Sequence, residues 1–251
     1  MQTIDRTVEI IETVGASPVG LTLTELCTSL ELPKTTAFRI LQALVGHDVL
    51  RKDESTKVYR LGPALITLGA HAVQQWDLRS VSRPYLQQLA RATNETVFLS
   101  VLYKDAAICL DTLDSDRSAR FLVGVGRKME FHAAAAAKAI LAFLPDDEIA
   151  RIVDRESLRP LTSQTITEAD QLIAHLKQVR QRGYAFCDGE AEVGVRAIAA
   201  PIIQGGHQAI GSVGIVAPAE RLDEEARERM LPLLRESVRQ ISEDMGYVTS
   251  E

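Results

Sequence analysis

The stretch TLTELCTSLELPKTTAFRILQALVGHDVLRKDESTKVYRL, residues 22–61, decides how the first quarter of this chain folds. Two short apolar-periodic segments flank the turn Glu31-Leu32-Pro33. Their spacing predicts two short helices that pack across a tight turn, the helix-turn-helix arrangement. Pro33 has no N–H to lose, so we expect it at the first position of the second helix. The apolar residues expected on that helix are Phe38, Ile40, Leu41, Leu44 and Val45.

The residues after Gly46 predict a β-hairpin. Val49–Lys52 and Val58–Leu61 are short strand-like runs around a polar tip, with basic residues on their flanks. A basic hairpin directly after a helix-turn-helix is typical of a wing. We therefore expect a winged helix-turn-helix domain over residues 1–62.

The local charge favours DNA binding over a merely structural helix pair. Between Lys34 and Arg60 there are six Lys or Arg and three Asp or Glu, whereas residues 61–251 hold 21 basic and 26 acidic side chains. Positive charge gathered on one small domain is the usual electrostatic footprint of DNA binding. The candidate base-reading residues are Lys34, Thr35, Thr36 and Arg39, and the candidate phosphate-binding residues of the wing are Arg51 and Lys57.

Length and composition bound the remaining possibilities. A chain of 251 residues, 46% hydrophobic and 25% charged, is expected to hold one large or two moderate globular domains. No run is long and apolar enough for a membrane span, and the N-terminal residues do not resemble a signal peptide. Cys27, Cys109 and Cys187 are far apart and form no CxxC pair, so we expect neither disulfides nor a structural zinc site. The expected setting is the cytoplasm, with no metal and no cofactor.

The remainder of the chain predicts an α+β domain, because helices alternate with runs rich in β-branched residues. A helix over 2–14 precedes the headpiece, a linker helix over 64–76 follows it, and residues 79–84 are the expected junction. The expected strands are 96–103, 106–113, 120–125, 183–188, 197–203 and 209–217. The expected helices are 133–144, one opening at Pro145, one over 167–182 capped by Thr167, and one over 220–247. We place the linker at 63–80 and an effector-binding, oligomerising domain with an antiparallel sheet covered by helices at 81–251.

Five motifs, collinear over nearly the whole chain, carry a family resemblance. They are LPKTTAFRILQAL at 32–44, VYRLGPALITLG at 58–69, FHAAAAAKAILA at 131–142, TIT at 165–167, and RGYAFCDGEAEVGVRAIAAPI at 182–202. The chain resembles the IclR-type bacterial transcriptional regulators. The resemblance implies a winged-helix domain, a linker helix and a GAF-like effector-binding domain. It also implies a homodimer or homotetramer on palindromic operator DNA, controlled by a small organic acid.

The resemblance also implies an effector pocket. Its backbone-amide element matches Ala135 and Ala136, and unsatisfied N–H groups at a helix start suit a carboxylate. The facing side matches Cys187, Asp188, Val195, Ala197 and Gly214, and Met129 or Phe131 is the expected lid. Several of these positions depart from the family pattern by being less polar or smaller. The departures favour a bulkier monocarboxylic acid with an apolar or aromatic body.

Other interpretations of single residues stay open. Cys187 beside Asp188 could be a nucleophile, but an inert buried thiol is the commoner case, so no catalytic residue is assigned. His132 could bind an anion or cap a helix, and the residues Ala133–Ala137 could simply be good helix formers. The histidines at 47, 71, 175 and 207 are expected at the surface.

Two functions of different classes fit the sequence. The first is a ligand-responsive transcriptional regulator, by expectation a repressor of a catabolic operon. The second is an enzyme of small-acid metabolism with an N-terminal interaction module. A purely architectural DNA-binding protein fits less well, because the large acidic α+β domain would then have no role.

Overall fold

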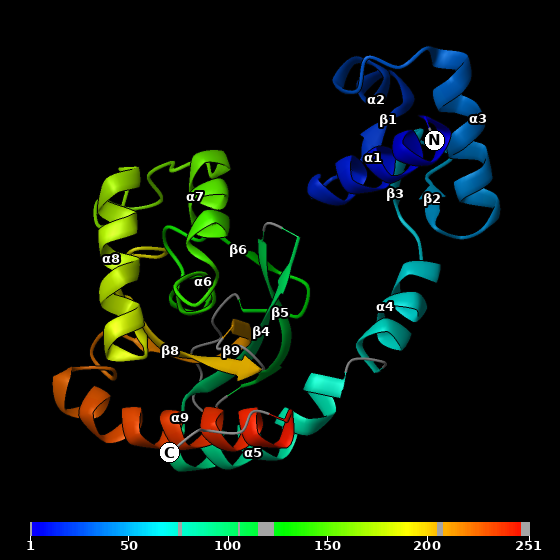
Figure 1. Ribbon diagram of the computed structural model, residues 1–251. Helices are drawn as coiled ribbons and strands as arrows, with labels where there is room; N and C mark the ends of the chain where they lie inside the picture. Colours follow the sequence, from blue (N-terminus) through cyan, green and yellow to red (C-terminus); the bar gives the residue numbers. More distant parts are fainter. Residues whose placement is uncertain (1, 75–76, 105, 115–122, 205–207, 247–251) are drawn as a thin grey trace. The chain divides into compact units, whose positions relative to one another are not determined.

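The computed structural model describes residues 2–74, 77–104, 106–114, 123–204 and 208–246. The chain divides into two compact units, residues 1–75 and residues 76–251 (Figure 1). The expected linker at 63–80 is therefore shared between the end of the first unit and the start of the second. Among the described residues, no helix is long and apolar enough to cross a membrane.

The first unit is the expected helix-turn-helix with its hairpin. Its elements are α1 (Gln2–Ala16), β1 (Leu21–Thr22), α2 (Leu23–Ser29), α3 (Lys34–Gly46), β2 (Leu50–Lys52), β3 (Val58–Leu61) and α4 (Ala64–Gln74). The strands form an antiparallel sheet in the order β1-β3-β2. The short strand β1 was not predicted, because two residues are too few to show a period.

Capping and turn chemistry set the limits of α2 and α3. Thr22 and Glu25 form a capping box, in which each side chain accepts a hydrogen bond from the other residue's backbone N–H. Pro33 stands at the N-cap of α3 and not at its first helical position, and its carbonyl accepts from the N–H groups of Thr36 and Ala37. Of the apolar residues expected on this helix, Phe38 is 48% exposed, whereas Ile40, Leu41 and Leu44 are buried.

The second unit is an α+β domain with a six-stranded antiparallel sheet in the order β6-β5-β4-β9-β8-β7. The strands are β4 (Thr96–Tyr103), β5 (Ala106–Leu113), β6 (Lys128–Met129), β7 (Ala185–Asp188), β8 (Val195–Gln204) and β9 (Gln208–Pro218). The helices are α5 (Asp77–Thr93), α6 (Ala135–Leu141), α7 (Asp146–Arg155), α8 (Ala169–Arg182) and α9 (Glu224–Asp244). Figure 1 shows α5 and α9 on one face of the sheet and α6, α7 and α8 on the other. The fold class predicted from the sequence is confirmed.

Several boundaries differ from the sequence-based ones. Part of the expected strand at 120–125 lies outside the described residues; residues 123–125 form no strand, and β6 begins at Lys128. The expected junction at 79–84 is helical, because α5 runs through it with Pro84 inside. Helix α8 begins at Ala169 after an N-cap at Glu168 that makes no side-chain cap, so the capping role assigned to Thr167 is wrong. Gly183 ends α8 in the left-handed conformation (φ 77°), as its position suggested.

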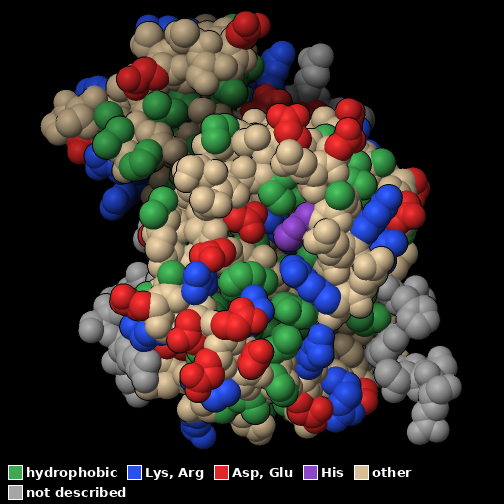
Figure 2. Space-filling view, turned by 90° about the vertical axis from the view of Figure 1, so that its left-hand side faces the viewer, with side chains coloured by type: hydrophobic (Ala, Val, Ile, Leu, Met, Phe, Trp, Pro, Cys, Tyr) green, Lys and Arg blue, Asp and Glu red, His purple; other side chains and the backbone are tan. Residues whose placement is uncertain are grey.

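Two buried carboxylates form ion pairs that join α5 to β5, and the segment after β9 to the residue that precedes β4. The guanidinium of Arg221 donates two hydrogen bonds, of 2.9 and 2.8 Å, to the carboxylate of buried Glu95. Buried Asp111 on β5 lies 2.5 Å from Arg83 and 3.3 Å from Arg79, both on α5. A buried carboxylate is tolerated only with such partners. On the outer face shown in Figure 2, by contrast, acidic and basic side chains are interspersed.

Candidate DNA-binding surface and effector pocket

Helix α3 presents the predicted base-reading residues on one face. Lys34, Thr35 and Arg39 are exposed and Thr36 is half-buried. The opposite face packs into the headpiece core through Ala37, Ile40, Leu41 and Leu44. Because one face of α3 is buried in the headpiece core, only the side chains on its opposite face are accessible to a DNA duplex.

The cationic side chains of the headpiece differ in whether their charge is already neutralised. Lys57 and Lys52 at the wing both contact the carboxylate of Glu54, at 3.0 and 3.1 Å. Both lysines donate hydrogen bonds to the Glu54 carboxylate and so lower its pKa, and the bond from Lys57 has the larger effect. Within the described part of the chain, no hydrogen bond or ion pair occupies Lys34, Arg39 or Arg51. Those three groups are available to phosphates or bases.

Sequence reasoning missed one feature of α3. Phe38, which directly precedes Arg39 in the sequence, is 48% exposed. It does not belong to the apolar cluster that forms the headpiece core. Apolar side chains in the major groove recognise the 5-methyl group of thymine.

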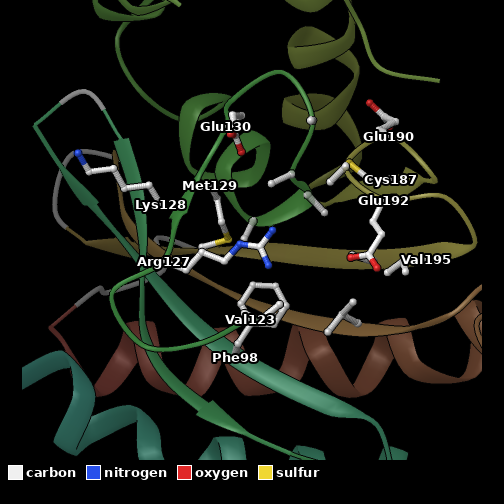
Figure 3. Close-up of a pocket in the computed structure, with 17 residues that line it drawn as sticks. Phe98, Val123, Arg127, Lys128, Met129, Glu130, Cys187, Glu190, Glu192 and Val195 are labelled. Carbon is white, nitrogen blue, oxygen red and sulfur yellow. The ribbon is translucent and has the colours of Figure 1, made fainter. Parts of the chain in front are cut away.

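The second unit contains a pocket of about 700 Å³, its open mouth included, beneath the start of α6 (Figure 3). Six of the nine predicted effector residues line it: Met129, Ala135, Ala136, Cys187, Val195 and Ala197. Further apolar lining comes from Phe98 on β4, Val216 on β9 and Val123. The structure therefore brings together residues that are up to 118 positions apart in the sequence, from Phe98 to Val216.

The other three predicted residues do not line this pocket. Phe131 is 1% exposed and belongs to the core. Asp188 forms an ion pair with Arg196 at 2.8 Å, which lowers the pKa of its carboxyl group. Gly214 lies opposite Phe98 in the strand register, and a Cβ at residue 214 would come within 2.4 Å of that ring. Gly214 thus makes room for Phe98, and Phe98 forms the pocket wall.

The start of α6 offers backbone donors to the pocket. The N–H groups of Ala133 and Ala134 donate to the carbonyl of Glu130, and the N-cap residue Ala134 makes no side-chain cap. Within the described residues, no acceptor is recorded for the N–H groups of Ala135 and Ala136. Both residues are nearly fully buried and line the pocket. Orphaned donors of this kind suit an anionic oxygen.

The pocket also holds charges that the sequence interpretation missed. Arg127, Lys128, Glu130, Glu190 and Glu192 all line it. Glu190 forms a short ion pair with Lys138, which is fully buried although it lies in the middle of α6. No local pattern signals this pair, because its members are 52 residues apart.

The open questions about Cys187 and the histidines are answered by burial. Burial raises the pKa of the Cys187 thiol to about 12, so it remains protonated at neutral pH. His132 is fully buried, with its ring nitrogens 3.2 Å from Glu156 Oε1 and 3.0 Å from the Arg159 carbonyl, so it joins two loops. His175 is half-buried rather than at the surface, and burial lowers its pKa to about 4. Among the described residues, no cluster of His, Cys, Asp and Glu could hold a metal ion.

Comparison with known proteins gives a consistent result. Residues 70–243 match the family model described as bacterial transcriptional regulator IclR C-terminal, and residues 3–54 match the IclR helix-turn-helix domain. The chain is 31% identical over 225 residues to the HTH-type transcriptional regulator KdgR of Escherichia coli (strain K12), covering 90% of this chain and 86% of KdgR. It is 29% identical over 246 residues to BhcR of Paracoccus denitrificans (strain Pd 1222), covering 98% of this chain and 88% of BhcR.

Solved structures agree. An IclR transcriptional regulator from Alicyclobacillus acidocaldarius superimposes with a TM-score of 0.84 at 26% identity, covering 98% of this chain and 99% of that one. An IclR homologue from Microbacterium hydrocarbonoxydans, complexed with 4-hydroxybenzoate, superimposes with a TM-score of 0.78 at 23% identity, covering 97% and 98%. The protein is therefore a DNA-binding, effector-responsive regulator of transcription and not an enzyme. The chain belongs to the IclR family of bacterial transcriptional regulators.

Proposed function

We propose that this regulator represses a catabolic operon in the cytoplasm from a palindromic operator, and that a monocarboxylic acid with an apolar or aromatic body is its effector. The observation that carries the proposal is the pocket beneath α6, where two orphaned backbone donors face an apolar wall. Among the relatives, AllR of Escherichia coli (strain K12), 26% identical over 245 residues (98% of this chain, 90% of AllR), is named a transcriptional repressor. The aromatic acid bound to the Microbacterium homologue supports the effector class.

The effector's carboxylate lies on the N–H groups of Ala135 and Ala136. Charge-assisted hydrogen bonds to backbone donors are strong and need no cationic side chain. The effector's body extends toward Val195 and Ala197, over the ring of Phe98, with Met129 closing the pocket. Phe131, the alternative lid, is buried in the core and does not serve.

Effector binding alters DNA affinity by favouring one arrangement of the paired headpieces. A ligand shifts such an equilibrium only by its difference in affinity for the two states. Helix α4 ends at Gln74 and α5 begins at Asp77, so residues 75–76 are the covalent route between the units.

The contacts with DNA are tested by substitutions in α3 and in the wing. Arg39→Ala should cost roughly 1–3 kcal/mol of binding free energy and relax one operator position, because Arg39 reads a base. Arg51→Ala should weaken all sequences alike and lower the salt slope by about 1, because Arg51 binds a phosphate. Lys57→Ala should have a smaller effect, since Glu54 already holds that ammonium. The measurement is fluorescence anisotropy on an operator selected from random duplexes; normal binding by Lys34→Ala, Thr36→Ala and Arg39→Ala would contradict the assignment.

Phe38 is expected to contact a thymine methyl group. When each operator thymine is replaced singly by deoxyuridine, the unaltered protein should lose affinity at one position of each half-site. Phe38→Ala should bind more weakly and show no further loss at that position, because the contact is already gone. Val8→Ala, which alters an exposed apolar residue outside α3, is the control. An equal uracil penalty in the Phe38 variant would exclude this contact.

Dimerisation is expected through the exposed face of α4, because one winged helix offers too small a footprint for operator selectivity. The proposed contact residues are Leu65, Leu68, Ala72 and Trp76. Leu65 is half-buried and Leu68 is 59% exposed, while the side chains of the other two lie outside the described residues. Light scattering at micromolar concentration should show a dimer or tetramer, and Leu68→Glu should weaken it while Val19→Glu does not. A monomer with and without DNA would refute the proposal.

The acid site is tested by removing one backbone donor. Ala136→Pro lacks the N–H and should weaken acid binding at least tenfold, since a hydrogen bond to a charged group contributes about 1.5–3 kcal/mol. Ala136→Gly retains the N–H and is the matched control. The measurement is isothermal titration calorimetry of the full chain with aliphatic and aromatic monocarboxylates. Failure of every acid to bind, or unchanged binding by the proline variant, would overturn the site.

A further inference from the structure

The charges around the pocket divide into those already engaged and those turned toward the ligand. Glu190 is paired with buried Lys138, and Glu130 lies 3.2 Å from a guanidinium nitrogen of Arg159. Figure 3 shows the side chain of Lys128 directed away from the pocket. The charges of Glu190 and Glu130 are therefore neutralised by their partners, and that of Lys128 is directed away from a ligand in the pocket.

The other two charged lining residues are Arg127 and Glu192. Figure 3 shows their charged ends directed into the pocket from opposite sides, above the ring of Phe98. No hydrogen bond or ion pair joins the Glu192 carboxylate to any other described residue, Arg127 included. An acceptor group thus faces the pocket opposite a cationic one.

The backbone that carries Glu192 is held in place on both sides. The N–H of Val195 donates to the carbonyl of Glu192, and the N–H of Gly189 donates to the carbonyl of Val195. The hydroxyl of Thr165 donates to the carbonyl of Glu190 at 2.7 Å. Glu192 therefore projects from a fixed loop.

Glu192 is exposed, so its carboxylate is hydrated. A ligand with a wholly apolar body that covers the carboxylate would displace this hydration and offer no hydrogen bond in its place. Leaving a charged acceptor without a partner costs more than an apolar contact returns. A ligand with an O–H or N–H donor at this position avoids the cost.

We infer that the effector is a hydroxy acid or an amino acid-like acid, whose hydroxyl or amino group donates a hydrogen bond to Glu192. The inference rests on the proposed acid site at Ala135 and Ala136 and defines the opposite end of the same ligand. Discrimination is expected to be large, because a site built to accept a donor rejects the analogue that lacks one more strongly than an apolar pocket rejects an added hydroxyl.

The test uses matched pairs of probes with the full chain. Benzoate is compared with 3- and 4-hydroxybenzoate, and butyrate with 4-hydroxybutyrate and 4-aminobutyrate, by isothermal titration calorimetry. In the unaltered protein, at least one donor-bearing acid should bind about tenfold or more tightly than its parent acid. Glu192→Leu should remove or invert that preference, whereas Glu130→Gln should retain it, because Glu130 is engaged by Arg159.

The possible failures are distinguishable. If no acid binds, or if Ala136→Pro binds acids unchanged, the proposed acid site fails, and this inference fails with it. If the parent acids bind but the donor gives no advantage, the acid site stands and the role of Glu192 is overturned. The same conclusion follows if the advantage persists unchanged in Glu192→Leu. An unchanged melting temperature of the Glu192→Leu variant would show that any loss of acid binding does not come from a folding defect.

Discussion

The buried ammonium of Lys138 is the constraint around which the effector unit is organised. A fully buried lysine is tolerated only with a counter-ion, and here Glu190 supplies it. The pair joins the middle of α6 to the loop after β7, two segments with no local reason to meet. Because Thr162 and Thr165 also donate to the carbonyls of this loop, the start of α6 and the opposite pocket wall form one connected structure.

Small residues set the depth of the pocket. Alanines at 133–137 let α6 lie close to the sheet, so its first N–H groups face the pocket and not solvent. Gly214 on β9 leaves the space that the ring of Phe98 occupies, and that ring then lines the pocket. A larger residue at 214 would act on the ligand indirectly, by pushing Phe98 into the pocket.

Local patterns predicted the headpiece well, because its helices and hairpin are short-range structures. The fold of the second unit was also predicted, from its alternation of helical and strand-like segments. Three details were not: the start of α8, which Thr167 does not cap, the helical structure of residues 79–84, and the absence of a strand at residues 123–125. Six of the nine predicted effector residues line the pocket, and five of these six came from the family resemblance. The charged groups were not predicted, because Glu190 is engaged by Lys138, which is 52 residues away and which no local pattern links to it. The exposure of Phe38 was not predicted, since an apolar residue on a helix looks the same in the sequence whether it faces a core or solvent.

The two ends of the pocket do different work in selecting a ligand. In the proposed site, the backbone N–H groups of Ala135 and Ala136 would donate to any carboxylate, so they would supply affinity with little discrimination. For a ligand with a donor, the proposed hydrogen bond to Glu192 only replaces the hydration that the carboxylate loses. For an acid without a donor, that hydration is lost with nothing in its place, so binding is weaker. Specificity is a difference of affinities, and an unfavourable contact with the wrong ligand contributes to it as much as a favourable contact with the right one. A regulator needs this arrangement more than tight binding, because common cellular acids would otherwise occupy the pocket and shift the same equilibrium.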